Sequence, residues 1–220
     1  MIINENGFVE EIEGKDIKDG KLVFPDGVKK IPNLCNGDYV LDDNKNVHFK
    51  FKSYHNNSYY PGYFNEDRYA FLGKIKEIHL PDSVVEVSGF SYLSNLEKIE
   101  LSENLVKIPE RCFEKCIQLK NIEIKDGLKQ IEDEAFAGCN KLERLVIPDS
   151  VEKMGKNVFI GNEKLEFLHL PNKISEISKT NLLFSNNLNE IVLPDSLKKL
   201  TRDDLSRKHK KWLQFYFTRK

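Results

Sequence analysis

The apolar residues of this chain return in a fixed phrase rather than in scattered clusters. A leucine is followed by two variable positions, a branched apolar residue, one variable position and another apolar residue, and this phrase recurs at a constant interval. The leucines that open it are Leu96, Leu119, Leu142, Leu165 and Leu188. Because one such unit cannot bury its apolar face alone, the constant period predicts similar units stacked around a continuous core.

Each unit contains the pattern of two short strands. With the leucine as position 1, positions 4 and 6 are apolar and alternate with polar residues, which predicts a strand with one buried face. A proline at position 7, such as Pro148, ends that strand because proline cannot donate to a ladder. Positions 10 and 13 form a second apolar pair. Position 18 is aromatic in three units, at Phe113, Phe136 and Phe159.

Together these positions predict a leucine-rich-repeat solenoid. We expect a right-handed coil of short parallel β-strands joined by tight turns or short helical segments, mainly β with some α. The predicted single domain comprises a lead-in with a first degenerate repeat (1–32), an aromatic-rich insertion (33–74), the repeats (75–200) and a basic C-terminal cap (201–220).

Two phrases resemble a known repeat, LKNIEIKDGLKQIEDEAFAGC at 119–139 and LERLVIPDSVEKMGKNVF at 142–159. They are similar to the BspA-type, or Treponema pallidum-type, leucine-rich repeat, which runs L-x-x-I-x-I-P-x-x-V-x-x-I-G-x-x-A-F-x-x-C. The resemblance covers roughly residues 19–32 and 75–217. It implies a binding scaffold, usually in bacterial surface or adhesion proteins and in some protozoa. It implies neither an enzymatic activity nor a cofactor.

Composition and the amino terminus bear on the location of the chain. The hydrophobic fraction of 40%, the charged fraction of 31% and the net charge of −1 are typical of a soluble globular protein. The start MIINENGFVEEIEG lacks the basic and apolar regions of a secretory signal. No segment reaches the roughly 20 apolar residues of a membrane-spanning helix. We therefore expect a cytoplasmic protein with no membrane span, or a cell-surface or secreted one if a native signal was removed.

The sequence predicts no catalytic residues, no metal site and no cofactor. It has no GxSxG, P-loop, HExxH or strand-linked GxGxxG pattern. His79, Glu100 and Glu123 fall at one repeat position on consecutive units, but a linear ladder does not converge on a metal ion, so we favour a solvated face. The four cysteines, Cys35, Cys112, Cys116 and Cys139, contain no CxxC pair, and we expect reduced, buried thiols.

The open face of the first strand is the leading candidate for binding. Side chains at positions 3 and 5 point away from the core. They are charged in the amino-terminal half and form an apolar patch in the carboxy-terminal half, at Val146, Phe167, His169 and Val192. Exposed apolar patches mark interaction sites, whereas valine on a sheet surface also reflects ordinary β-propensity. We predict that a protein partner contacts this patch.

The period lapses in the aromatic-rich insertion, which is a second candidate. VHFKFKS (47–53) alternates like a hairpin strand, and HNNSYYPGYFNED (55–67) has the composition of a turn-rich tip. We expect Phe49, Phe51 and Phe71 to cover the amino-terminal end of the core. Tyr59, Tyr60 and Tyr63 either share that task or bind. A glycan-binding or cell-surface adhesion module that uses these tyrosines is the alternative to protein–protein interaction.

The carboxy terminus is basic. Residues 198–220 hold nine Lys or Arg against two Asp, so the rest of the chain carries about −8. The densest part is a basic patch of Arg207, Lys208, Lys210 and Lys211. An acidic partner or a nucleic acid could bind there, but we favour a solvated helix end, and nucleic acid ranks last among the expected partners.

Overall fold

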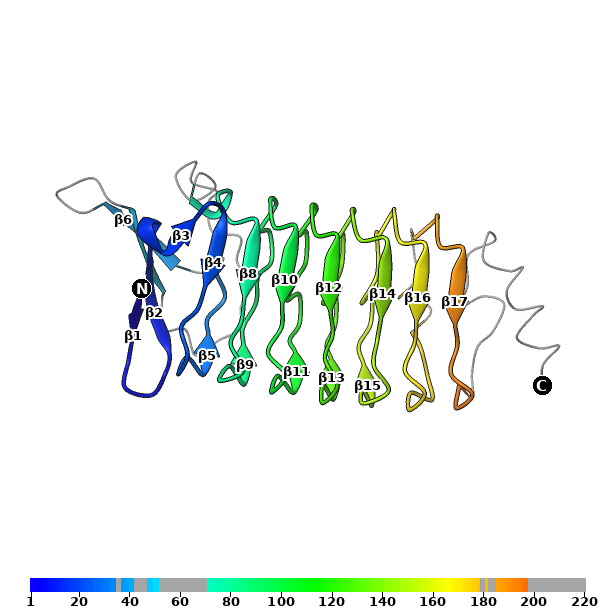
Figure 1. Cartoon of the computed structure of the whole chain (residues 1–220). Helices are drawn as coiled ribbons and strands as arrows, with labels where there is room; N and C mark the ends of the chain where they lie inside the picture. The colour runs from blue at the N-terminus through cyan, green and yellow to red at the C-terminus, as the bar shows by residue number, and fades with distance from the viewer. Residues whose placement is uncertain (35–36, 42–46, 52–70, 179–180, 182–184, 198–220) are drawn as a thin grey trace.

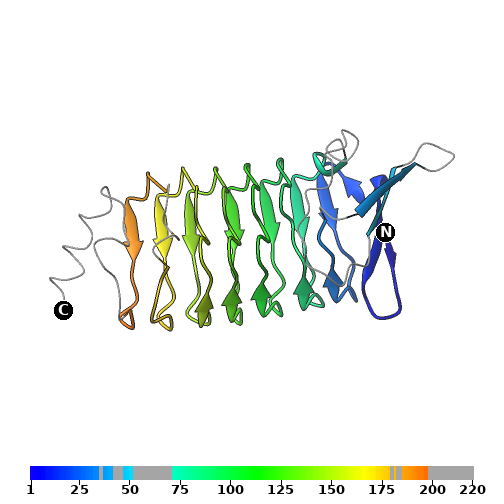
Figure 2. The same ribbon diagram turned by 180° about the vertical axis from the view of Figure 1, so that it is seen from behind.

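The computed structural model describes residues 1–34, 37–41, 47–51, 71–178, 181 and 185–197. Successive turns of the chain, here called rungs, stack side by side into an elongated solenoid (Figure 1). The first strand of each rung lies beside the first strand of the next, and the amino terminus lies at one end of the stack (Figures 1 and 2). The predicted leucine-rich-repeat solenoid is therefore confirmed.

The first strands of the rungs form two parallel ladders. One has the order β12-β10-β8-β4, with β3 antiparallel at its edge, and the other has the order β14-β16-β17. The bounds are β3 Ile17–Lys18, β4 Lys21–Val23, β8 Glu77–His79, β10 Lys98–Glu100, β12 Asn121–Glu123, β14 Arg144–Val146, β16 Phe167–His169 and β17 Glu190–Val192. Residues at the same repeat position pair, as Ile99 does with Ile122 and Leu145 with Leu168. The period of the repeat thus sets the strand register.

The second apolar pair of each repeat forms shorter strands, also parallel. Strands β11, β13 and β15 make one ladder, and β5 pairs with β9. The bounds are β5 Lys30–Ile31, β9 Glu86–Val87, β11 Lys107–Ile108, β13 Gln130–Ile131 and β15 Lys153–Met154. From residue 75 to 178 the remaining connections are turns and bends, so tight turns rather than short helices join the strands. No helix in the described ranges is long and apolar enough to cross a bilayer.

An antiparallel sheet of different design stands at the amino-terminal end (Figure 1). Its order is β1-β2-β7-β6, with β1 at Ile2–Ile3, β2 at Val9–Glu13, β6 at Gly37–Leu41 and β7 at Val47–Phe51. A 3-10 helix, η1 at Gly14–Asp16, leads from β2 into the first rung. The hairpin pattern around residues 47–53 is confirmed, since β6 and β7 pair antiparallel. The pairing of that hairpin with the lead-in strand β2 is a feature that the period did not predict.

Leucines and phenylalanines fill the core in columns. Leu96, Leu119, Leu142 and Leu165 are completely buried. The rings of Phe90, Phe113, Phe136 and Phe159 stack, with neighbouring centroids 5.6, 5.2 and 6.3 Å apart. Phe71 is buried as predicted, at 2% exposure, whereas the side chains of Phe49 and Phe51 lie outside the described part.

Three cysteines lie in this core and form no disulfide with one another. Cys112, Cys116 and Cys139 are buried and unpaired by disulfides. The Cys139 thiol donates to the main-chain oxygen of Phe113 at 3.1 Å, and Cys116 makes the same bond to Phe90 at 3.1 Å. Burial raises the pKa of the Cys139 thiol to about 12. These three thiols are structural, as predicted, and Cys35 lies outside the described residues.

Candidate functional site

The open face of the first strands divides at the boundary between the two ladders. Val23 on β4, His79 on β8 and Glu100 on β10 lie in one column, and the residues that follow along it are Glu123, Val146, His169 and Val192. Charged residues dominate the outward positions of the ladder that ends at β12. The ladder that begins at β14 instead carries Val146, Phe167 and Val192 there, together with Arg144, His169 and Glu190. The change in chemistry coincides with the break in hydrogen bonding.

The charged half neutralises itself through contacts along the face. Glu100 accepts from Lys98 at 2.5 Å and lies 2.7 Å from the Nδ1 atom of His79. These two hydrogen bonds, the one from Lys98 above all, lower the pKa of Glu100 to about 2. Lys21 and Glu77 form a further pair at 2.9 Å. Few charges remain here to attract a partner.

The histidine and glutamates of this half do not gather around one point. Glu123 turns to Lys125, at 3.0 Å, rather than to Glu100. Within the described ranges, no group of three or more His, Cys, Asp or Glu side chains has the arrangement of a metal site. The two histidines of the column, His79 and His169, stand on different ladders.

The apolar half brings all four predicted patch residues together. Strand β16 places His169 beside Val146 on one side and Val192 on the other. Val146 is 44% exposed and Val192 is 38% exposed. In the adjacent column, the guanidinium carbon of Arg144 lies 3.5 Å from the centroid of the Phe167 ring, a cation–π contact. Arg144 thus lies beside the apolar patch of Val146, Phe167, His169 and Val192.

His169 lies at the centre of the apolar patch with an unsatisfied nitrogen. Its Nδ1 atom is buried and has no hydrogen-bond partner within the described part of the chain. An unsatisfied buried polar atom costs about 1–3 kcal/mol. His79, at the same repeat position, makes the hydrogen bond to Glu100 that His169 lacks.

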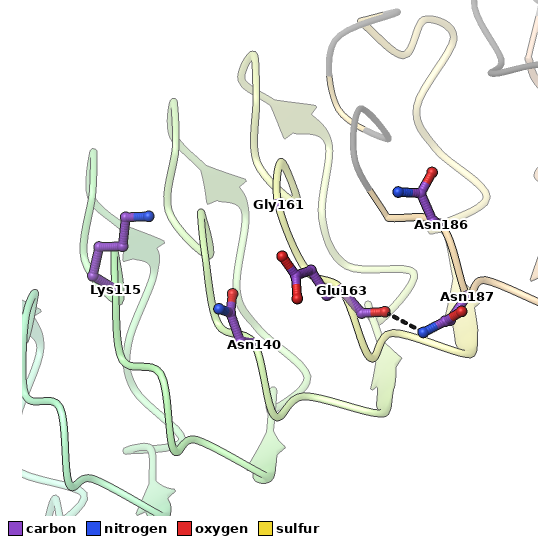
Figure 3. Close-up of a pocket in the computed structure, with 6 residues that line it drawn as sticks. All are labelled: Lys115, Asn140, Gly161, Glu163, Asn186 and Asn187. Carbon is purple, nitrogen blue, oxygen red and sulfur yellow. Dashed lines mark hydrogen bonds between the residues drawn. The ribbon is translucent and has the colours of Figure 1, made fainter.

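A polar hollow lies away from the apolar patch, in the turns that precede the first strands (Figure 3). It has a volume of about 450 Å³. Its lining residues come from consecutive rungs, and they are Lys115, Asn140, Gly161, Glu163, Asn186 and Asn187. Sequence reasoning missed this hollow because residues scattered over four repeats form it.

The backbone at one repeat position shapes the floor of this hollow. Tyr92, Lys115, Gly138 and Gly161 all have positive φ, between 59° and 74°. Glycine adopts this left-handed conformation without strain, and two of the four rungs use it. The recurrence of glycine exactly one repeat apart, at Gly138 and Gly161, was the available sequence signal for a special turn.

The remaining predicted site residues lie outside the described part. They are the insertion tyrosines Tyr59, Tyr60 and Tyr63 and the basic patch Arg207, Lys208, Lys210 and Lys211. Their proposed roles remain predictions.

Solved structures with this architecture come from several bacteria. The leucine-rich repeat protein of T. pallidum is similar over 89% of this chain and 82% of its own length, with 21% identity and a TM-score of 0.63. A leucine-rich repeat protein of Bacteroides ovatus ATCC 8483 is similar over 90% of this chain and 52% of its own, with 24% identity and a TM-score of 0.48. At 21% identity the likeness to the T. pallidum protein concerns the fold alone.

A third solved structure is described as a cell surface protein. This leucine-rich protein of Faecalibacterium prausnitzii A2-165 is similar over 85% of the chain and 34% of its own length, with 23% identity and a TM-score of 0.46. The chain therefore spans about a third of that protein. No curated protein sequence matches the chain at a significant level.

The repeats themselves establish the family. The pattern of the BspA type leucine rich repeat region matches residues 83–209 in six copies. This span exceeds half of the 220 residues, and it includes β9 to β17, whose register follows the repeat. Repeats of this kind generally form non-enzymatic binding scaffolds. The chain belongs to the BspA-type leucine-rich repeat family.

Proposed function

We propose that this protein is a non-enzymatic binding module that contacts a protein partner through the apolar patch. The observation that carries the proposal is the exposure of Val146 and Val192 on either side of His169, on consecutive strands of one ladder. Burying apolar surface contributes about 25 cal/mol per Å². A partner that covers these three side chains removes their apolar surface from water, and this burial favours binding.

The neighbouring column gives the apolar patch a recognition element. Arg144 is held over the face of Phe167, and arginine and aromatic residues are enriched where protein interfaces concentrate their binding energy. The stacked guanidinium keeps its N–H donors in one plane, where they can meet an acceptor of the partner. Glu190 lies beyond Phe167 in the same column, so opposite charges flank the ring and can set the orientation of the partner.

A valine elsewhere on the same face provides a matched control. Val23 occupies the equivalent position on β4 and is 54% exposed, but its neighbour in the column is His79 of the charged half. If exposed valines reflect only the β-propensity of a sheet surface, Val23 and Val146 behave alike. If the apolar patch binds the partner, a substitution of Val146 lowers the affinity for the partner and a substitution of Val23 does not.

The test compares Val146→Lys, Val192→Lys and Val23→Lys with the wild type. Proteins captured from a lysate of the native host are identified, and the affinity of each captured partner is then measured by calorimetry. We expect Val146→Lys and Val192→Lys to weaken binding at least tenfold, with Val23→Lys unchanged. Equal affinity of all four proteins would contradict the proposal.

The other predicted contacts remain secondary to this one. The insertion tyrosines and the basic patch are further candidates for partner contact, and substitutions of both can be tested in the same binding assay. The expected location, cytoplasmic or, if a native signal was removed, at the cell surface or secreted, also remains a prediction.

A further inference from the structure

The polar hollow contains hydrogen-bonding groups in an ordered array (Figure 3). Asn140, Glu163 and Asn186 stand at one repeat position on three consecutive rungs. Neighbouring rungs of parallel strands are about 4.8 Å apart, so these groups follow one another at that interval along the solenoid. Lys115 lines the hollow one rung before Asn140, from a different repeat position, the one that Gly138 and Gly161 occupy on the following rungs.

The two charges of the hollow are not used in the fold. Lys115 and Glu163 form no ion pair within the described residues, although lysine and glutamate pair across rungs elsewhere, as Lys120 does with Glu97 at 2.9 Å. Lys115 and Glu163 stand two rungs apart, which is about 10 Å. The hollow therefore offers a donor at one end and an acceptor further along, with no net charge.

The amides of the hollow are oriented by the backbone. The Asn140 amide is assigned with its nitrogen towards the backbone, because only that orientation lets it donate to the main-chain oxygens of Gly138 at 3.1 Å and of Gly161 at 3.0 Å. In that orientation Asn140 offers a ligand its oxygen. Asn187 donates to the main-chain oxygen of Glu163 at 2.8 Å. These bonds hold the side chains in place before a ligand arrives, which lowers the entropic cost of binding.

The floor of the hollow is open backbone. A Cβ atom on Gly161 would meet nothing nearer than the Cα atom of Gly138, at 3.8 Å, and Gly161 itself lines the hollow. A flat ligand can therefore approach the peptide groups closely. The volume of about 450 Å³ lies in the range of small-molecule sites.

We infer that this hollow binds a neutral oligosaccharide laid along the solenoid axis. Sugar hydroxyls both donate and accept hydrogen bonds, so they can donate to Glu163 and Asn140 and accept from Lys115. A phosphate-bearing ligand needs a surplus of cations that the hollow lacks. A protein partner needs an apolar or aromatic anchor, and none of the lining side chains is apolar. This site is separate from the apolar patch and does not depend on it.

The test uses the full chain and a panel of neutral tetrasaccharides: cellotetraose, maltotetraose, mannotetraose and chitotetraose. Binding is followed by the amide resonances of Gly138 and Gly161 in a nitrogen-15-labelled sample. We expect at least one sugar to shift both resonances saturably at millimolar concentration. Glu163→Ala should weaken that binding at least tenfold, and Asn186→Trp should abolish it by filling the hollow.

Two controls separate this site from other surfaces. Glu166→Ala removes an exposed glutamate that lies three residues after Glu163 and does not line the hollow, and it should bind as the wild type does. Val146→Lys should leave sugar binding unchanged even where it removes the protein partner. The absence of a saturable shift with all four sugars would overturn the inference, as would equal affinity of Glu163→Ala and Glu166→Ala.

Discussion

Leu142 shows what each repeating leucine contributes to the core. It opens a repeat, is completely buried and belongs to the column of leucines inside the solenoid. Its burial removes apolar area from water and fills a space that no other group reaches. Because the repeat pattern identifies such residues from spacing alone, this part of the core was predictable.

The substitution Leu142→Ala should lower the free energy of unfolding by about 2–5 kcal/mol, because a truncated buried leucine leaves a cavity. Urea denaturation monitored by circular dichroism measures this loss. Val106→Ala is the control, since Val106 is 53% exposed and should change stability little. An unaltered midpoint for Leu142→Ala would mean that the repeat register is wrong.

The buried thiols lead to a second prediction at this scale. Only a thiolate is a good nucleophile, and desolvation raises the pKa of both Cys112 and Cys139. At about pH 8, near the ordinary cysteine pKa of about 8.5, Cys112, Cys116 and Cys139 should therefore resist iodoacetamide in the folded protein. Peptide mapping should find them labelled only after denaturation. Rapid labelling of any of the three in the folded state would contradict their placement in the core.

At the scale of the element, the strands of the open face differ in how they use their outward side chains. On strands β8 and β10 the outward side chains of His79 and Lys98 both contact the carboxylate of Glu100. Strands β14, β16 and β17 leave Val146 and Val192 exposed instead. The alternating pattern predicted which side chains point outward, but not which of them find a partner on the next strand.

The contacts of Glu100 with Lys98 and His79 should make the free energy of unfolding depend on pH in the acidic range. The pKa of Glu100 is about 2 in the folded protein, below its ordinary value of 4.5, so the unfolded chain takes up the proton first. The stabilisation is complete above about pH 4.5 and is lost as the pH falls towards about 2. Because Glu100 is about half exposed, at 48%, solvent screening keeps the effect small.

Urea denaturation at a series of acidic pH values checks this effect. Wild type and Glu100→Gln should converge in stability as the pH falls from about 4.5 to about 2. Parallel pH profiles of wild type and Glu100→Gln would rule out the proposed pairing.

At the scale of the whole molecule, the solenoid needs its ends covered. A stack of repeats exposes the apolar core at each end unless another element shields it. The antiparallel sheet of β1, β2, β6 and β7 stands at the amino-terminal end (Figure 1). Val9 and Ile12 of β2 are buried in the same core as the leucines, so this sheet serves as the amino-terminal cap.

The substitution Ile12→Ala should test the cap. Ile12 is 1% exposed, and its truncation should cost about 2–5 kcal/mol. Since each rung contacts mainly its neighbours, hydrogen exchange should rise in β4 and β8 before it rises in β16. Ile12→Val should show a smaller change of the same kind. A uniform rise along the solenoid would instead indicate that the rungs unfold as one unit.

Phe90 shows where prediction from spacing stops. It joins the ring stack of Phe113 and Phe136, yet its rung is shorter than the others, because Ile75 and Leu96 stand closer together in the chain than Leu96 and Leu119 do. A constant repeat spacing therefore does not identify Phe90 as a member of the phenylalanine column. The antiparallel pairing of β2 with β7 was hidden for a related reason, because nothing local in either strand specifies its partner.

The sequence by itself determined the solenoid, its strand register and its columns of buried residues, because every repeat encodes the same local geometry. Each repeat is short, so an error in assigning one residue to its repeat position is not carried into the next repeat. It also determined which residues of the apolar patch face outward. Only the tertiary structure decided which outward groups pair and how Lys115, Asn140 and Glu163 come to line one hollow. It alone also shows that the buried Nδ1 atom of His169 has no hydrogen-bond partner among the described residues. Those features depend on contacts between rungs, which the order of residues within a single rung does not specify.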